Sequence, residues 1–274
     1  MTPDNDRPPT PIHALGAHFL GGLTYFGSVA LLMGDILRWL MKGMFSRQAR
    51  FDSSALTAQM VRVGVKSTSI VMLVQLFIGV ILALQLTPPL AQWSQEAQVS
   101  RIIGLGGFRM LGPIITAVVL SGFAGASIAA ELGTMAVSEE IEALEAAAIN
   151  PVRFLAVPRV MATTVMTILL TVLADLCIAA GGYVTSLLVL GPTSYEGYWA
   201  RMQEQLRFQD FFTGLTQSGV FGLLVGLIAC HEGLSTTGGA EGVGKATTRT
   251  VVLSIVAIIA AACVFTVVFY VWEK

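Results

Sequence analysis

VVLSIVAIIAAACVFTVVFYVW, residues 251–272, contains no charged side chain, and this stretch decides the fold. An α-helix rises about 1.5 Å per residue, so the run is long enough to cross the roughly 30 Å of hydrocarbon in a bilayer. Water is absent there, so the backbone must satisfy its own hydrogen bonds, and a single segment does so as a helix. The run therefore predicts a membrane-spanning helix.

Four earlier runs have the same apolar character. They are Ile70–Leu86, Met110–Ala130, Val160–Leu190 and Phe211–Ala229. The chain of 274 residues is 54% hydrophobic and only 12% charged, which lies outside the range of soluble domains. We predict an all-α polytopic membrane protein with about five transmembrane helices. The third is the longest and is expected to tilt, kink or emerge beyond the membrane near Gly181 and Gly182.

The N-terminal region differs from these runs. Residues 1–11 are polar and proline-rich, and we expect a disordered segment with no cleavable signal. Over residues 12–45 apolar side chains recur at helical spacing beside a polar face, which is typical of an amphipathic helix lying along the membrane interface. A sixth span through Leu20–Met33 is the alternative, although that stretch is short for a bilayer. The loops are too short for a second core, so residues 12–274 are predicted to form one domain.

Basic residues collect on one side of the predicted spans. On that side lie Arg38, Lys42, Arg47, Arg50, Arg62, Lys66, Arg153, Arg159, Lys245 and Arg249, and on the other Arg101, Arg109, Arg201, Arg207 and Lys274. The positive-inside rule then places the N-terminus in the cytoplasm and, after five spans, the C-terminus outside it. The net charge of −1 provides no basic surface for nucleic acid, which is therefore not an expected partner.

Small residues recur four apart in two of the spans. They are Gly122, Ala126 and Ala130 in the second, and Ser218, Gly222 and Gly226 in the fourth. Rows of this kind let helix backbones approach closely in lipid. They favour either packing within one bundle or contact with a second copy.

A short acidic helix is predicted between the second and third spans. Residues 131–158 read ELGTMAVSEEIEALEAAAINPVRFLAVP, in which Ser138 is a candidate N-cap and Asn150 with Pro151 a candidate end. The residues that we single out are Ser138, Glu139, Glu140, Ile141, Glu142, Leu144 and Glu145. The pattern fits a solvated loop helix and a docking element for a partner equally well.

Ionisable residues inside apolar spans are functional candidates, because lipid makes them costly. Asp175 lies in the middle of the third span, with Thr171 as a possible hydrogen-bonding neighbour, and Glu131 lies at the end of the second. Both can be read as structural or as a site that takes part in transport. The adjacent His231 and Glu232 favour a helix-end pair over a metal site, because no further ligands converge on them in the sequence.

The chain resembles the MlaE/YrbE-type permeases of lipid-transporting ABC systems. The resemblance rests on Leu111-Gly112-Pro113, on GASIAAELGTM at 125–135, on VSEEIEALEAAAINPVRFLAVPRVMA at 137–162 and on GKATTRTVV at 244–252. Two departures remove charges near the second span. Met110 stands where the family often has Glu, and Phe123 stands where it often has Arg.

The resemblance implies a permease subunit without enzymatic activity of its own. It implies a homodimer in the bacterial inner membrane, with ATP and magnesium bound by a separate cytoplasmic ABC ATPase that docks on residues 139–144. The expected partners are a hexameric periplasmic MCE-domain protein and a STAS-domain protein, and the expected cargo is phospholipid for outer-membrane lipid homeostasis and asymmetry. A lipid cavity between the copies would include Leu73, Phe77 and Val80.

Two other classes of function compete with this interpretation. A secondary, proton-coupled transporter of a hydrophobic substrate would use Asp175 and Glu131 as relay carboxylates, and it would usually contain internal repeats. We find no convincing repeat between the halves of the sequence. A lipid-modifying membrane enzyme is disfavoured, since no Ser/His/Asp set or metal cluster stands at plausible positions in the spans.

Overall fold

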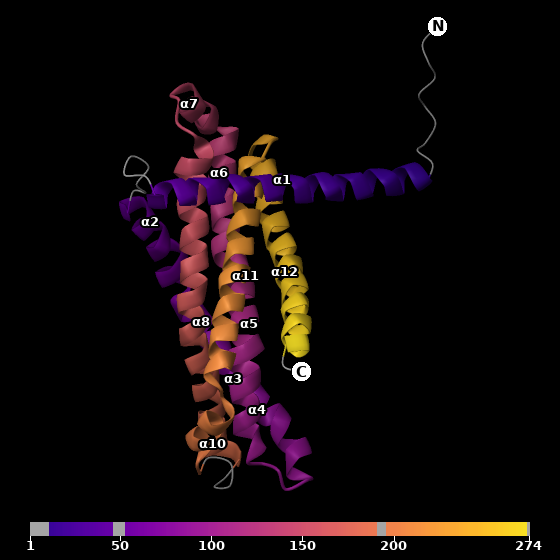
Figure 1. Cartoon of the computed structure of the whole chain (residues 1–274), viewed down its shortest axis with the longest axis vertical. Coiled ribbons are helices and arrows are strands. Elements are labelled where there is room, and N and C mark those ends of the chain that lie inside the picture. The colour runs from indigo at the N-terminus through magenta and orange to yellow at the C-terminus, as the bar shows by residue number, and fades with distance from the viewer. Residues whose placement is uncertain (1–10, 46–52, 191–195, 273–274) are drawn as a thin grey trace.

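The computed structural model describes residues 11–45, 53–190 and 196–272, and nearly all of these residues are helical (Figure 1). The α-helices are α1 (Pro11–Phe45), α2 (Ser53–Met60), α3 (Lys66–Ala91), α4 (Gln98–Gly106), α5 (Gly112–Leu120), α6 (Ala126–Val137), α7 (Glu140–Ala146), α8 (Val157–Thr185), α10 (Tyr198–Gln205), α11 (Phe208–Leu234) and α12 (Gly239–Trp272). Short π-helical turns join some of them, namely η2 (Val61–Val65), η3 (Gly107–Leu111), η4 (Ser121–Gly125), η5 (Val152–Ala156) and η6 (Ser186–Leu190). The segment predicted to be disordered lies outside the described residues, except for Pro11.

Five continuous helical stretches are long and apolar enough to cross a membrane. They are Ser54–Ala91, Gln98–Val137, Val152–Val189, Phe208–Leu234 and Gly239–Val271. Each contains or nearly contains one predicted apolar run and extends beyond it, because the flanking polar residues continue the helix. The predicted all-α fold with five spans is confirmed, and the protein is a multi-pass membrane protein.

The spans form a bundle with two distinct ends (Figure 1). The α7 end carries α1, α2 and α7, and the α10 end carries α4 and α10. The first described span starts at the α7 end, and α12 starts there too and runs towards the opposite end. The five spans therefore alternate in direction, as the predicted topology requires.

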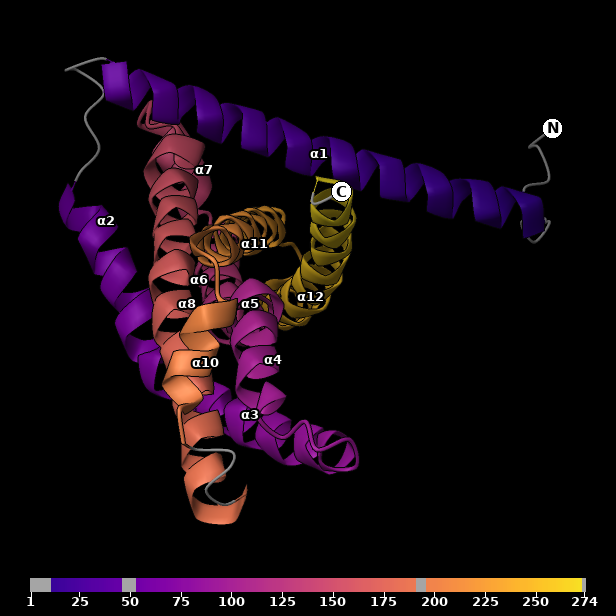
Figure 2. The ribbon, with the colours of Figure 1, turned by 60° about the horizontal axis from the view of Figure 1, so that its bottom comes forward.

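Helix α1 lies crosswise to the bundle at the α7 end, along one side of it (Figures 1 and 2). Its Ile36 side chain is only 1% exposed and belongs to the core of the bundle, whereas Phe26 is 76% exposed and Leu31 74%. A helix that is anchored at one face and presents apolar side chains elsewhere fits the membrane interface. The prediction of an interfacial helix is confirmed, and the alternative of a sixth span does not hold.

The inner and outer helices of the bundle differ in burial. Helix α8 packs against both α3 and α11, and α12 packs against α11 and α6. Half of the most apolar window is buried in the spans built on α8 and α11, compared with 22% in the first span and 17% in the last. The first and last spans therefore expose long apolar faces to lipid or to another protein chain.

Glycines set the close contacts of α8. A Cβ atom on Gly181 would lie 2.2 Å from the carbonyl oxygen of Leu76, and one on Gly79 would lie 2.1 Å from that of Ile178. The backbones of α3 and α8 thus touch where side chains are missing. Helix α8 continues through Thr185, so Gly181 and Gly182 do not end it and instead allow close packing.

The small-residue row of the fourth span also serves packing within the chain. A Cβ atom on Gly222 would lie 2.5 Å from Oγ1 of Thr167, and one on Gly226 would lie 2.3 Å from Oγ1 of Thr163. Both threonines belong to α8. Of the two interpretations of this row, packing within one bundle is the one that the structure supports.

Candidate functional site

Helix α7 stands at the tip of the α7 end, between the second and third spans (Figure 1). Ile141 and Leu144 are half-buried against the core of the bundle, while Glu139, Glu140, Glu142 and Glu145 are exposed. The amphipathic pattern predicted from the sequence is therefore present. The apolar face of α7 packs against the core of the bundle, and its acidic face is exposed on the surface.

The ends of α7 differ from the prediction. Ser138 is not its N-cap, because its hydroxyl donates to the carbonyl oxygen of Thr134 at 3.0 Å and so closes the end of α6. Glu139 occupies the N-cap position with a left-handed backbone, φ 61°. At the other end α7 stops at Ala146, and Asn150 instead accepts a hydrogen bond from the backbone N–H of Arg153 at 3.0 Å, at the start of the next span.

A hollow of about 300 Å³ lies beside α7, lined by Met135, Glu140, Ala143, Leu144 and Phe154. The Phe154 side chain is 58% exposed and Ile149 is 40% exposed. Exposed apolar side chains next to an acidic face are typical of a protein-docking surface. We call α7 with Phe154 and Ile149 the α7 surface.

Glu131 joins three spans at the α7 end. Its carboxylate lies 2.7 Å from Nη1 of Arg62 in the first span and 3.2 Å from Nη2 of Arg159 in the third. The Arg159 side chain is only 6% exposed, and it also donates to the carbonyl oxygen of Leu155 at 2.8 Å. Glu131 is thus a clamp between two guanidinium groups, and we call this set the Glu131 clamp.

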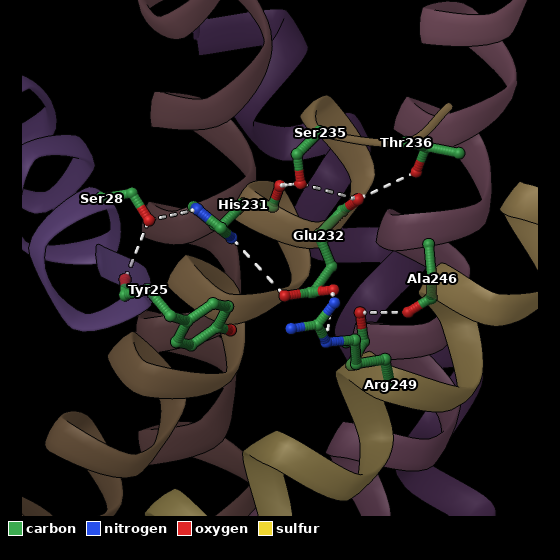
Figure 3. Close-up of polar contacts among 9 residues, drawn as sticks. Tyr25, Ser28, His231, Glu232, Ser235, Thr236, Ala246 and Arg249 are labelled. Atoms are coloured by element: carbon green, nitrogen blue, oxygen red, sulfur yellow. Dashed lines mark hydrogen bonds and ion pairs between the residues drawn. The ribbon is translucent and has the colours of Figure 1, made fainter. Parts of the chain in front are cut away.

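A second polar cluster ties α1 to α11 and α12 (Figure 3). Ser28 Oγ lies 2.7 Å from Nε2 of His231, whose Nδ1 lies 3.5 Å from the Glu232 carboxylate. Arg249 approaches the same carboxylate with Nε at 3.4 Å, and its guanidinium lies 5.6 Å from the ring centroid of Tyr25. The cluster fixes the interfacial helix to the last two spans.

Tyr25 and the Glu232 carboxylate face each other in this cluster (Figure 3). Burial, followed by the nearby carboxylate, raises the pKa of the Tyr25 hydroxyl above its usual range, so the hydroxyl stays protonated. His231 and Glu232 form the helix-end pair that the sequence favours. Among the described residues no three His, Cys, Asp or Glu side chains gather to hold a metal ion.

Asp175 has a different environment from Glu131. Its side chain is 1% exposed in the middle of α8, and its Oδ1 has no hydrogen-bond partner in the described part of the chain. Thr171 is not the neighbour that the sequence suggested, because its hydroxyl donates to the carbonyl oxygen of Thr167 at 2.8 Å. Asp175 packs instead against the bare Cα of Gly112, where a Cβ atom would lie 1.9 Å from Oδ1. Glu131 and Asp175 thus do not form one site.

Gln75 completes the polar surroundings of Gly112. Its amide nitrogen donates to the carbonyl oxygen of Gly112 at 3.1 Å and to Oγ1 of Thr116 at 3.0 Å. The first three spans therefore meet at a buried polar layer. Nothing in the sequence pattern singled out Gln75, because it lies in an otherwise apolar run.

The α10 end holds an apolar cavity of about 380 Å³ between the second, fourth and fifth spans. Arg109, Met110, Gln217 and Phe269 are among its lining residues. The Arg109 guanidinium lies 3.5 Å from the Asp210 carboxylate. Met110 stands where the family that the chain resembles often has Glu, and its side chain leaves this wall of the cavity apolar.

The residues predicted to line a lipid cavity lie on α3. Leu73 and Phe77 are each 53% exposed, and Val80 is half-buried. They belong to the outward face of the first span rather than to an enclosed cavity of a single chain. Phe123, the second departure from the family pattern, is 41% exposed near Arg62 and Lys66.

Comparison with known families settles the membership of the chain. The sequence profile described as Permease MlaE matches residues 56–268, which include all five spans except their outermost residues. The chain belongs to the MlaE permease family. It is therefore an ABC transporter permease subunit rather than a catalytic subunit, and a permease of this kind works with an ATPase partner.

Curated relatives of the permease include proteins from bacteria and from a plant. A probable ABC transporter permease protein of Synechocystis is 34% identical over 229 residues, covering 83% of this chain and 84% of the relative. One of Rickettsia felis is 33% identical over 217 residues, covering 79% and 83%. The chloroplastic protein trigalactosyldiacylglycerol 1 of Arabidopsis thaliana is 31% identical over 243 residues, covering 89% and 67%.

Candidate site residues of the permease could be identified from the sequence, but the residues that contact them could not. It identified Glu131 and the pair His231–Glu232, yet missed Arg62, Arg159 and Arg249 as the groups that neutralise these carboxylates. Their positions in the sequence could have indicated these contacts, because all three arginines stand at span ends on the side that the positive-inside rule selects. It also missed Tyr25 and Ser28 as the contacts of the interfacial helix.

Proposed function

We propose that this permease is the transmembrane subunit of an ATP-driven ABC transporter that moves phospholipid between the bacterial inner membrane and a periplasmic MCE-domain protein. The observation that carries the proposal is the α7 surface, an acidic helix seated on the core at one end of a five-span bundle that belongs to the MlaE family. The acidic face suits docking in a groove of a cytoplasmic ATPase. That subunit would bind ATP and magnesium, and the permease itself would need no cofactor.

The distribution of charge supports a cytoplasmic position for the α7 end. The basic side chains at this end are Arg38, Lys42, Arg62, Lys66, Arg153, Arg159, Lys245 and Arg249, against Arg101, Arg109, Arg201 and Arg207 towards the α10 end. The positive-inside rule then places the N-terminus in the cytoplasm and the C-terminus in the periplasm. The α10 end would face the MCE-domain partner, which the family resemblance suggests to be hexameric, and a STAS-domain protein would join the ATPase.

The exposed faces of the outer helices support lipid as cargo. The first and last spans bury little of their apolar surface within one chain. A second copy of the permease, facing these helices, would close a cavity lined by Leu73, Phe77 and Val80. The plant relative carries the name of a glycerolipid, which supports the same class of cargo.

The Glu131 clamp supplies a route from the ATPase to the lipid-facing helices. Helix α7 follows α6 directly, and α6 carries Glu131, which binds Arg62 of the first span and Arg159 of the third. A movement imposed on α7 would therefore be transmitted to three spans through short, charged contacts. The clamp would let ATP binding outside the membrane open or close the cavity inside it.

The proposal is tested by purifying a tagged permease from native membranes in mild detergent and identifying the attached proteins and lipids by mass spectrometry. We expect an ABC ATPase, an MCE-domain protein and phospholipid. The double variant Glu142→Lys, Glu145→Lys should lose the ATPase, because both side chains are exposed on α7 and do not support the core. The control Glu196→Lys, an exposed acid near α10, should retain it.

Two outcomes would contradict the proposal. One is an ATPase that stays bound to the α7 variant as firmly as to the wild type, which would reject the docking assignment. The other is a permease that purifies alone and without lipid under conditions that preserve other complexes. The proton-coupled alternative would then come forward, because the buried Asp175 is the feature of the structure that favours it.

A further inference from the structure

A cavity lies at the α7 end, away from the lipid-facing side of α3 and α12. It has a volume of about 600 Å³ and is bordered by α1, α2, η5, the start of α8 and the loop that follows α7. Its lining residues are Trp39, Ala55, Leu56, Ala58, Gln59, Ala148, Ile149, Asn150, Arg153, Phe154, Leu155, Pro158, Arg159 and Met161. Two are arginines and none is Asp or Glu; Arg159 is paired with Glu131, so the positive charge of an otherwise mostly apolar lining comes from Arg153.

Cations collect at one aromatic ring in this wall. The Arg153 guanidinium lies 5.0 Å from the ring centroid of Trp39, and Nζ of Lys42 lies 5.1 Å from it. Within the described residues neither cation has a carboxylate in ion-pair distance. Two like charges held at one indole without an acidic partner attract an anion.

Two buried polar atoms of the lining have no hydrogen-bond partner in the described structure. They are Nε of Arg159, a donor, and Oε1 of Gln59, an acceptor. The Arg159 side chain is 6% exposed, and the Glu131 clamp and Leu155 use its other nitrogen atoms. Buried polar atoms are nearly always paired, so these two indicate a ligand that both accepts and donates hydrogen bonds.

The depth of the cavity in the membrane limits which kinds of ligand can reach it. Trp39 belongs to α1, the helix that lies along the interface, and η5 begins the third span there. The cavity is therefore at the depth of the lipid headgroups, with apolar walls formed by residues such as Leu56 and Met161. A charged headgroup with acyl chains attached satisfies both parts of the lining.

We propose that this cavity binds an anionic glycerophospholipid with a hydroxylated headgroup, in the leaflet at the α7 end, as a resident lipid that is not transported. The phosphate would lie between Arg153, Lys42 and Arg159, and a headgroup hydroxyl would donate to Gln59. The bound lipid would connect α1 to the start of the third span, next to the Glu131 clamp. The site depends only on membrane insertion of the chain and is independent of the proposed transport of lipid.

The test measures lipid retained by the full-length permease, purified in detergent, with native mass spectrometry during titration with phosphatidylglycerol or phosphatidylcholine. Arg153→Gln should weaken phosphatidylglycerol binding at one site about tenfold, which corresponds to about 1.4 kcal/mol at 25 °C. Lys42→Gln should weaken it about threefold, since Lys42 is exposed and screened. The control Arg38→Gln, on the same helix but outside the cavity, should change it by less than about twofold, because an exposed charge outside the site contributes little.

Further measurements distinguish a bound lipid from a soluble phosphate and from a docked protein. Phosphatidylcholine should not compete for the site, and inorganic phosphate at equal concentration should not displace the lipid. Full displacement by inorganic phosphate would reject a membrane lipid in favour of a soluble phosphate. Equal phosphatidylglycerol binding by wild type and both cavity variants would overturn the proposal. Loss of the ATPase from Arg153→Gln, with lipid binding unchanged, would assign the cavity to protein docking instead. ATP-dependent transport, measured in parallel, tests the proposed function separately.

Discussion

Glu131 and Asp175 are both carboxylates at the edge or in the middle of a membrane span, but the structure gives them opposite surroundings. Glu131 binds two arginines from two other spans. Asp175 lies 16 positions beyond Arg159 on the same helical stretch, about 24 Å away at 1.5 Å per residue, and has no cation beside it among the described residues. The comparison indicates that Glu131 is held in place by ion pairs, whereas Asp175 is a buried carboxyl group held by packing.

The largest effect should come from removing the charge of the clamp. Glu131→Gln leaves the buried Arg159 without its counter-charge, and removing the half-buried partner of a buried cation costs roughly 3 kcal/mol. We expect a clear fall in the thermal unfolding midpoint of the purified permease and in its abundance in the membrane. The control Glu241→Gln breaks an exposed pair with Lys245, 2.7 Å apart, and should have almost no effect. Equal stability of the two variants would contradict the clamp.

A smaller loss is expected where Asp175 meets Gly112. Gly112→Ala places a methyl group against Oδ1 of Asp175 in a packed interior, which costs roughly 2 kcal/mol. Asp175→Ala in the same background should restore most of that stability, since the two positions are in contact. Thermal unfolding of the two single variants and the double variant measures this coupling. Additive losses would show that Asp175 does not pack against Gly112.

Replacing Arg62 should destabilise the permease less than replacing Glu131. The Arg62 side chain is 43% exposed, so Arg62→Gln leaves Glu131 paired with the buried Arg159 and costs about 1 kcal/mol or less. Repeating the unfolding measurement in high salt should narrow the difference from wild type, because salt screens the exposed pair. A loss as large as that of Glu131→Gln would show that Arg62 is the main partner.

The smallest change is expected for Asp175→Asn. The amide keeps the size of the side chain, and the replaced oxygen makes no hydrogen bond that the described structure records. Stability should stay within about 1 kcal/mol of wild type. ATP-driven lipid transport by the complete complex should also be retained. Loss of transport with normal stability would give Asp175 the relay role of the alternative interpretation.

The spans and the acidic helix could be predicted because their signals are local. An uninterrupted apolar run such as residues 251–272 has one physical solution in lipid, and the spacing of Ile141 and Leu144 defines the inward face of α7. The crosswise placement of α1 also followed from its amphipathic pattern. Such features depend on neighbours in the sequence and need no knowledge of the rest of the fold.

The contacts of the site could not be predicted, because they join residues that are far apart in the sequence. Arg62 and Glu131 are separated by 69 positions, and Ser28 and His231 by 203. The prediction that Ser138 caps α7 was also wrong for a local reason. Its hydroxyl reaches the carbonyl oxygen of Thr134 in the preceding turn, so it ends α6 instead of starting α7. The packing role of Gly181 could not be predicted for a related reason, since close contact with α3 cannot be seen in α8 alone.

In the proposed function, ATP and not a proton gradient drives the transport of lipid. The most direct measurement uses the permease with its copurified ATPase in proteoliposomes and follows a fluorescent phospholipid, for wild type and Asp175→Asn. We predict movement that requires ATP, that persists when the proton gradient is collapsed, and that Asp175→Asn retains. Movement that a proton gradient drives without ATP, and that Asp175→Asn abolishes, would contradict the account.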